Sequence, residues 1–278
     1  MKILFYIKLL RPLNVITSAI AVIISAAIIN VLGDLQTLIL TSVIVMLYAA
    51  GSNALNDAID HEIDLINRPG RPIPSGNVTI NEALIISFIF FSLGTILCLQ
   101  LPTIAIIIGV VIAVPLMVVY STHLKGKNIF GNIAVSLILG MAFLFSGAAY
   151  GRVLPMWIPM TLAFGLTLIR ELVKDIADID GDQFSGLQTF PIMYGINRSI
   201  QLVVFLCVLV GGGSLIPYLN GVYGEGYVLL LVIGVEIPLA MVVALLWKNP
   251  SNSSATYCAR ILKFSTLMGL FAIYLGTI

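Results

Sequence analysis

The chain has 278 residues, of which 59% are hydrophobic and only 10% are charged, and its net charge is +1. Soluble domains carry about 25% charged residues, so this composition excludes an ordinary soluble protein and indicates an integral membrane protein. The small net charge, without any basic run, gives no basis for nucleic-acid binding. The three cysteines, Cys98, Cys207 and Cys258, stand singly in apolar segments and are expected to be small core residues.

Apolar segments of about 20 residues recur along the chain, and each is long enough to cross a hydrocarbon core of about 30 Å as a helix. Strands of membrane barrels are shorter and alternate in polarity, so we expect an all-α fold. The pattern predicts nine transmembrane helices, at residues 13–32, 36–56, 82–100, 103–121, 130–150, 155–174, 198–219, 227–247 and 257–277. Residues 1–278 are thus expected to form one polytopic transmembrane domain.

The basic residues are distributed unevenly between the two sets of loops that these spans define. The N-terminal segment and the loops after the second, fourth, sixth and eighth spans contain 13 of the 14 Lys and Arg residues, whereas Arg152 alone falls in the other set. Cytoplasmic loops are enriched in Lys and Arg. We therefore predict a multi-pass protein of the cell membrane whose N-terminus and charged loops face the cytoplasm.

The densest group of charges lies in residues 56–76, which read NDAIDHEIDLINRPGRPIPSG. Its four acids are Asp57, Asp60, Glu62 and Asp64. A shift of 118 residues places them on four acids of a second motif at residues 170–189, namely Asp175, Asp178, Asp180 and Asp182. Each group follows an apolar span, and these two spans are four apart. The pattern predicts two four-helix repeats plus one helix around a central cavity, with both acidic groups on the same side of the membrane.

Residues four apart share one face of a helix, so Asp60 with Asp64, and Asp178 with Asp182, are each predicted to direct two carboxylates toward one place. Crowded carboxylates repel unless a cation lies between them, and hard oxygen ligands suit Mg²⁺ bound together with a substrate phosphate. One such cluster alone is equally consistent with solvated loop charges, but its duplication argues against that alternative. A calcium-binding EF-hand loop fails because Gln183 and Thr189 replace its required Gly and Glu.

Both acidic motifs resemble those of the UbiA-type intramembrane prenyltransferases. The first motif of that family, N-D-x-x-D-x-x-x-D followed by R-P-[IL]-P-S-G, is matched by Asn56, Asp57, Asp60 and Asp64 and by RPIPSG at residues 71–76. The second, D-x-x-x-D, is matched by Asp178 and Asp182. The segment LLRPLN at residues 9–14, and Tyr120 with Lys125 after the fourth span, extend the resemblance over essentially the whole chain.

The resemblance implies an enzyme that binds a polyprenyl diphosphate through Mg²⁺, ionises the allylic C–O bond and lets an acceptor capture the cation. Metal ions would neutralise the charge that develops on the leaving diphosphate, with Asp60, Asp64, Asp178 and Asp182 as the expected catalytic residues. The expected metal ligands are Asn56, Asp57, Asp60, Asp64, Asp175, Asp178 and Asp182.

Basic residues near the motifs are expected to donate to the diphosphate oxygens, although each also suits an ordinary positive-inside anchor. They are Arg68, Arg71, Lys125 and Lys127. The ring of Tyr120 is placed to face the allylic cation, or else is an interfacial tyrosine. Arg11 and Asn14 are further candidate contacts of the acceptor or the cation.

The segment RELVKDIADIDGD at residues 170–182 resembles the archaeal family members that attach a second geranylgeranyl chain, through an ether link, to geranylgeranylglyceryl phosphate. This resemblance implies geranylgeranyl diphosphate and geranylgeranylglyceryl phosphate as the two substrates. Arg170 and Lys174 are then the candidates for binding the acceptor phosphate, and their pairing with Glu171, Asp175 or Asp178 is the alternative.

Two other functions are open from the sequence. RPIPSG and GLQTFPI also resemble segments of the chlorophyll synthases, which makes a tetrapyrrole or an aromatic quinone precursor the alternative acceptor. A transporter of a phosphorylated lipid or a divalent cation is the alternative of a different class. Against it, few ionisable residues other than Glu236 lie near the middle of the predicted spans.

Overall fold

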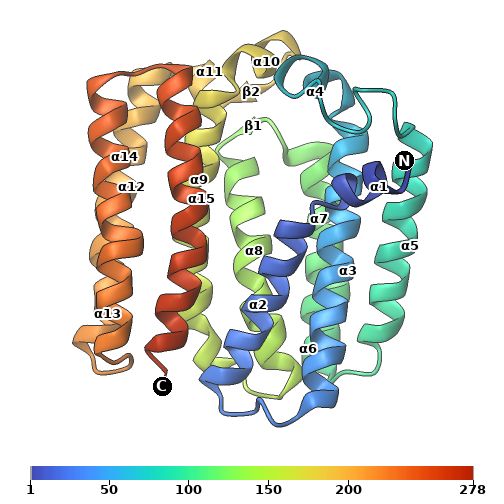
Figure 1. The fold of residues 1–278 in the computed structure, drawn as a ribbon, viewed down its shortest axis with the longest axis vertical. Helices are drawn as coiled ribbons and strands as arrows, with labels where there is room; N and C mark the ends of the chain where they lie inside the picture. The colour runs from blue at the N-terminus through green and yellow to red at the C-terminus, as the bar shows by residue number, and fades with distance from the viewer. Residues whose placement is uncertain (1, 278) are drawn as a thin grey trace. The chain divides into compact units, whose positions relative to one another are not determined.

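The computed structural model describes residues 2–277, and its regular structure is almost entirely helical (Figure 1). The helices are α1 (Lys2–Leu10), α2 (Pro12–Ile28), α3 (Leu35–Ile59), α4 (His61–Asn67), α5 (Ile80–Cys98), α6 (Thr103–Ile106), α7 (Val114–Val119), α8 (Phe130–Ala149), α9 (Trp157–Ala177), α10 (Ile179–Phe184), α11 (Phe190–Tyr194), α12 (Ile196–Leu219), α13 (Glu225–Leu231), α14 (Ile237–Lys248) and α15 (Asn252–Leu275). Short π-helical segments at Ile107–Ala113, Tyr120–Leu124 and Val232–Glu236 continue some of them, and a 3-10 turn at Leu154–Met156 precedes α9. The two-residue strands β1 (Lys127–Asn128) and β2 (Gln188–Thr189) pair in parallel. The predicted all-α class is confirmed.

The contacts divide the chain into two compact units. The first contains the chain up to Lys125 together with Met141–Met156, and the second contains Gly126–Gly140 together with the chain from Trp157 onward. The first acidic motif belongs to the first unit and the second motif to the second unit.

Eight helical segments are long and apolar enough to span a bilayer: Leu35–Ile59, Ile80–Cys98, Thr103–Leu124, Phe130–Ala149, Leu154–Ala177, Ile196–Leu219, Glu225–Lys248 and Asn252–Leu275. They fall on the second to ninth predicted spans. The predicted first span falls on α2, which has 17 residues and meets α1 at 44°. The break follows from the left-handed backbone of Arg11 (φ 53°) and from Pro12, which disfavours helix at the preceding residue. The described residues reach nine spans only if this bent pair counts as one.

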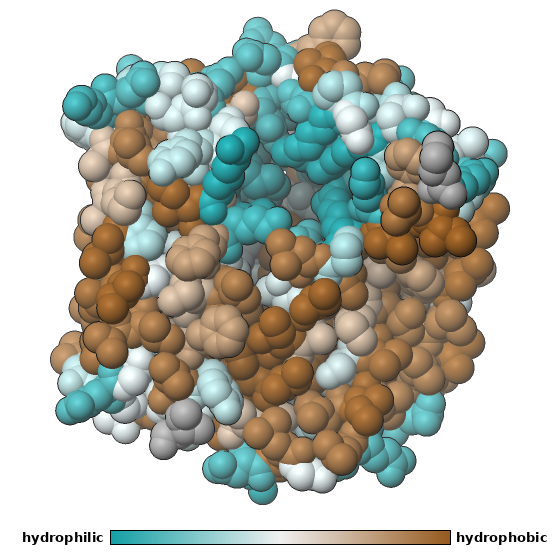
Figure 2. Space-filling view, in the orientation of Figure 1, coloured by the Kyte–Doolittle hydropathy of each residue, from teal (hydrophilic) through white to brown (hydrophobic). Residues whose placement is uncertain are grey.

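Apolar side chains cover most of the face seen in Figure 2. Elsewhere in the described residues, large apolar side chains such as Phe88 and Val208 are more than two-thirds exposed. A helix satisfies its backbone N–H and C=O groups internally, which is what a hydrocarbon environment demands. Polar side chains cap the N-terminal ends of α3 and α5. Thr79 and Glu82 form a capping box at α5, and Asp34 accepts a hydrogen bond from the Thr37 backbone N–H at α3.

In the first unit, α3 packs against α2 and α5 and carries the start of the first acidic motif at its C-terminal end (Figure 1). Gly94 of α5 allows this close packing, because an added Cβ there would lie 2.6 Å from the ring of Tyr48. Helix α1 also contacts α3, and Leu9 lies fully buried against Ala54 and Ala58. This apolar contact holds the α1–α2 junction beside the end of α3.

In the second unit, α9 packs against α12 and α15 (Figure 1). Its buried residues Ile169, Leu172, Val173 and Ile176 recur three and four apart, as expected for the buried face of a helix. Asp175, the first of the four matched acids of the second motif, lies on the last turn of α9. Burial of this apolar face therefore fixes where the motif emerges.

Glu236, the acid that stands alone near the middle of a predicted span, is tied to α12. Ser214 donates a hydrogen bond to Glu236 Oε1 at 2.7 Å. An added Cβ at Gly211 would lie 2.7 Å from Glu236 Oε2, so glycine leaves room for the carboxylate. This close approach explains Gly211, the first of three consecutive glycines at residues 211–213.

Candidate active site

The first carboxylate cluster consists of Asp57, Asp60 and Asp64. Helix α3 ends at Ile59, and Asp60 stands between α3 and α4. The Asp64 backbone N–H donates to the Asp60 carbonyl at 2.8 Å, so these two acids keep the predicted spacing of one helical turn. All three side chains are buried, with at most 3% of each residue exposed. Buried carboxylates require charged or hydrogen-bonding partners.

Arg71 supplies partners for two of these acids. Its Nη1 donates to Asp57 Oδ1 at 3.1 Å and to Asp64 Oδ2 at 2.5 Å. Burial raises the pKa of the Asp64 carboxyl, and the adjacent Arg71 opposes that rise. The chain thus turns back at RPIPSG, so that Arg71 contacts the acids that precede it in sequence.

Two further basic residues complete the cluster. The Arg11 guanidinium donates to Asp57, and the Lys125 ammonium donates to Asp60. Arg11 comes from the α1–α2 junction, and Lys125 follows the π-helical turn at Tyr120–Leu124. Three carboxylates are therefore matched by three cations from separate parts of the chain. Of the predicted contacts, the structure brings Arg11, Arg71 and Lys125 to the first cluster.

Ser121 is a site residue that the sequence analysis missed. Its hydroxyl lies 2.6 Å from the side-chain carbonyl oxygen of Asn56 and donates to it, and both residues lie in the first unit. Nothing in the spacing of Ser121 marks it, because the contact depends on how the chain folds. Tyr120, which is buried, begins the same π-helical turn.

The second motif repeats the local backbone of the first. Helix α9 ends at Ala177, Asp178 stands before α10, and the Asp182 backbone N–H donates to the Asp178 carbonyl at 3.1 Å. Asp60 (φ −83°, ψ 5°) and Asp178 (φ −97°, ψ 7°) have nearly the same conformation. This region of backbone space is sparsely used and often holds active-site residues. The predicted one-turn spacing of the paired acids is present in both motifs.

Asn132 is the second residue that the sequence analysis missed. Its side-chain amide, on α8, donates to Asp175 Oδ2 at 2.8 Å, and Asn132 is buried. The 118-residue shift that relates Asp57 to Asp175 also relates Asn14 to Asn132, so the repeat contained a signal for it. Asn14 itself is exposed and forms no side-chain hydrogen bond with any described residue.

Arg170 and Lys174 are joined through Glu171. Arg170 Nη1 lies 3.1 Å from Glu171 Oε1, and Lys174 Nζ lies 2.6 Å from Glu171 Oε2. Glu171 is buried, whereas 24% of the Arg170 side chain and 30% of the Lys174 side chain are exposed. The pairing with Glu171 that the sequence left open is therefore present, and it holds the two cations side by side.

Glu62, Asp180 and Lys127 lie outside the contacts described above, whereas Arg68 follows Asp64 by one helical turn. Glu62 is exposed, with 82% of its side chain accessible, and Asp180 accepts a hydrogen bond from Asn252 at 2.9 Å. Lys127 lies in β1, is exposed and forms no ion pair with any described residue. Arg68 ends α4, and its backbone N–H donates to the Asp64 carbonyl.

The donors fit magnesium bound together with a phosphate. Within residues 2–277, no three His, Cys, Asp or Glu side chains form a ready-made metal site, and in the first cluster basic side chains stand beside the carboxylates. Carboxylate and amide oxygens are nevertheless the hard ligands that Mg²⁺ prefers, and Mg²⁺ usually binds a few of them along with substrate phosphates. The buried acids can bind the magnesium ion, and the adjacent basic side chains can bind the phosphate.

Buried acids and bases at the ends of membrane-spanning helices are typical of functional sites in membrane proteins. The model of the UbiA prenyltransferase family matches residues 15–267, and the chain belongs to this family. The protein is therefore a multi-pass membrane prenyltransferase. Membership of this family favours an enzyme over the transporter that the sequence analysis left open.

Curated relatives resemble the chain over most of its length. It is 35% identical to the digeranylgeranylglyceryl phosphate synthase of Methanopyrus kandleri over 269 residues, which cover 96% of this chain and 97% of the relative. It is 38% identical to the synthase of that name from Natronomonas pharaonis over 227 residues, which cover 81% and 82% of the two chains.

Solved structures agree with the fold. One from work on digeranylgeranylglyceryl phosphate synthase in membranes aligns with a TM-score of 0.79 at 34% identity and covers 100% of this chain and 99% of the other. A UbiA homologue from Archaeoglobus fulgidus, bound to DMAPP and Mg²⁺, has a TM-score of 0.68 at 18% identity and covers 96% and 98% of the two chains.

Proposed function

We propose that this prenyltransferase transfers a geranylgeranyl group from geranylgeranyl diphosphate to the glycerol hydroxyl of geranylgeranylglyceryl phosphate, forming an ether-linked lipid precursor. The observation that carries the acceptor assignment is the similarity, over nearly the full length, to synthases named for that product. The bond that forms is the glyceryl ether C–O bond, and the bond that breaks is the allylic C–O bond to diphosphate.

Magnesium would be held by Asp60, Asp64, Asp178 and Asp182, supported by Asn56, Asp57 and Asp175. When bound, it supplies charge neutralisation of the leaving diphosphate. The chain itself contributes cationic donors, because Arg71 and Lys125 already lie on the first carboxylate cluster and can turn to phosphate oxygens. The apolar helices keep water away from the allylic cation.

The acceptor phosphate is assigned to Arg170 and Lys174, which Glu171 holds side by side. Two adjacent cations suit a phosphate monoester better than they suit an uncharged acceptor. The excess of basic residues in one set of loops supports a cytoplasmic location for the N-terminus and for both motifs.

The test is a transfer assay in detergent with radiolabelled geranylgeranyl diphosphate and a panel of acceptors. We expect geranylgeranylglyceryl phosphate to react with Mg²⁺ present, and unphosphorylated geranylgeranylglycerol to react at least about tenfold less well, the scale of a lost charge-assisted contact. Transfer only to an aromatic or tetrapyrrole acceptor would overturn the acceptor assignment and leave the prenyltransferase class intact.

A further inference from the structure

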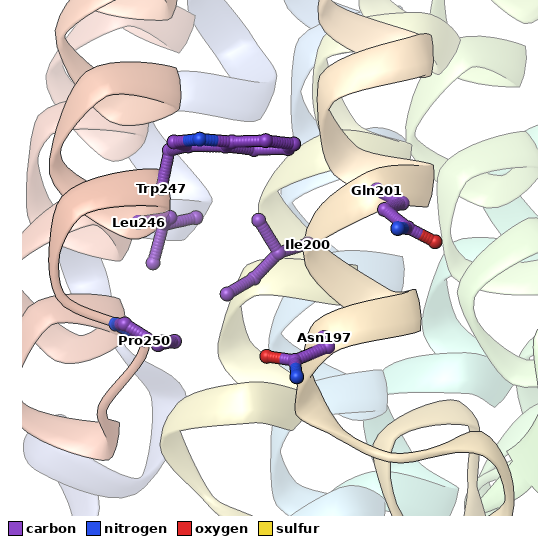
Figure 3. Close-up of a pocket in the computed structure, with 6 residues that line it drawn as sticks. All are labelled: Asn197, Ile200, Gln201, Leu246, Trp247 and Pro250. Carbon is purple, nitrogen blue, oxygen red and sulfur yellow. The ribbon is translucent and has the colours of Figure 1, made fainter.

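A pocket of about 230 Å³ lies in the second unit, between the first turns of α12 and the last turn of α14 (Figure 3). It is lined by Asn197, Ile200, Gln201, Leu246, Trp247 and Pro250. In Figure 3, Ile200 and Leu246 project toward each other from the two helices, and the ring of Trp247 extends toward α12. None of these residues belongs to the carboxylate motifs, so the pocket is not part of the candidate active site.

The pocket lies at the ends of two membrane spans. Helix α12 begins at Ile196, and α14 ends at Lys248, so both candidate spans terminate here. Span ends lie at the level where hydrocarbon gives way to lipid headgroups, and tryptophan is enriched at that level. Trp247, with 65% of its surface exposed, fits this position. Membrane lipid headgroups can therefore reach the pocket.

The lining combines an apolar floor with polar walls. Ile200 and Leu246 are buried, whereas Asn197 and Gln201 are exposed and present carboxamides one helical turn apart. None of the six lining residues is acidic. Carboxamides can donate to phosphate oxygens and accept from hydroxyl groups.

Two basic residues adjoin the lining in sequence. Arg198 follows Asn197, and Lys248 follows Trp247. Both are exposed, and neither forms an ion pair with a described residue. Unpaired Lys and Arg at the membrane surface attract anionic lipid. The local charge therefore favours an anionic headgroup over a zwitterionic one.

We propose that this pocket binds the anionic phosphoglycerol headgroup of a membrane lipid. The phosphate faces Arg198 and Lys248, the glycerol hydroxyls meet the two carboxamides, and the first chain carbons rest on Ile200 and Leu246. The volume is smaller than the roughly 300–1,000 Å³ of sites that enclose drug-sized ligands, so the pocket admits a headgroup and not a whole lipid. This site does not depend on the acceptor assignment.

The test uses Trp247 as the reporter. The chain has two tryptophans, so Trp157→Phe leaves Trp247 as the sole one. This variant, in phosphocholine nanodiscs, is titrated with brominated phosphoglycerol or brominated phosphocholine lipid, and quenching of fluorescence is measured. We expect half-quenching at an at least threefold lower mole fraction of the phosphoglycerol lipid. Equal quenching by the two lipids would overturn the proposal.

Further substitutions, made in the Trp157→Phe variant, test which residues cause the preference for phosphoglycerol lipid. Asn197→Leu with Gln201→Leu, and separately Arg198→Gln with Lys248→Gln, are each expected to abolish the preference. Asn220→Leu, which removes an exposed amide at the other end of α12, is the matched control and should keep it. If the preference survives in both pocket variants, or disappears when inorganic phosphate replaces chloride at equal ionic strength, the lipid assignment is wrong.

Discussion

Asn132 donates its side-chain amide to Asp175 at 2.8 Å, whereas the equivalent acid of the first motif, Asp57, is bound by Arg11 and Arg71. The two equivalent carboxylates therefore have different partners. A neutral amide orients a carboxylate without cancelling its charge, while two guanidinium groups compensate it. We predict that the orientation of Asp175 depends on this single amide, whereas Asp57 is held by two cations.

Asn132→Asp should lower turnover and raise the Mg²⁺ concentration for half-maximal rate, because it places a like charge against Asp175. Asn132→Ala should have a smaller effect of the same kind, roughly ten- to a hundredfold, since it removes one hydrogen bond to a charged group. The measurement is the rate as a function of Mg²⁺ concentration.

The control is Ser136→Ala on the same helix, which removes a hydroxyl bonded to the Asn132 backbone carbonyl and leaves the amide in place. A Mg²⁺ dependence that is unchanged in Asn132→Asp would contradict a positioning role.

Arg71→Leu should destabilise the protein by about 3–5 kcal/mol, because it leaves two buried carboxylates without their shared partner. Arg71→Lys keeps the charge but loses the planar guanidinium whose Nη1 contacts both acids, so an intermediate loss is expected. Thermal unfolding in detergent measures the effect. Lys127→Leu, at an exposed base that pairs with no acid in residues 2–277, should change the free energy of unfolding by less than about 0.5 kcal/mol. Equal losses in Arg71→Leu and Lys127→Leu would contradict a stabilising role for the contacts of Arg71 with Asp57 and Asp64.

Alanine at Asp60, Asp64, Asp178 or Asp182 should each reduce turnover by at least about a hundredfold, the scale of losing a main stabiliser of transition-state charge. Glu62→Ala and Asp180→Ala are the matched controls, because Glu62 is exposed and Asp180 is bonded to Asn252. Their turnover should fall much less. Similar losses at all six positions would contradict the pairing of acids one turn apart.

Chelation of divalent cations should abolish turnover, and added Mg²⁺ should restore it, because the diphosphate and the carboxylates repel each other without a cation. The experiment compares initial rates in excess EDTA with rates after Mg²⁺ is returned. Full activity in EDTA would remove the metal from the mechanism.

Lys174→Ala should raise the acceptor KM about ten- to a hundredfold and change the KM for geranylgeranyl diphosphate much less, since it removes one charge-assisted contact to the acceptor phosphate. Glu171→Gln, which keeps the shape but loosens both cations, should raise the same KM by a smaller factor. Equal increases for both substrates would place these residues at the diphosphate instead.

The sequence by itself determined the class of fold, the family and the paired acids. Runs of about 20 apolar residues require helices in a bilayer, and the one-turn spacing of Asp60 with Asp64 and of Asp178 with Asp182 is a property of the local chain. These features do not depend on long-range contacts, so they can be recognised without a structure.

Tertiary structure decided which groups neutralise the acids. Arg11 reaches Asp57 across 46 residues, and Lys125 reaches Asp60 across 65, through packing that no local pattern encodes. Ser121 became a site residue for the same reason, whereas the repeat that relates Asn14 to Asn132 carried a signal for Asn132 in the sequence. A buried carboxylate must find a partner wherever the fold places one, and only the folded chain specifies which side chain that is.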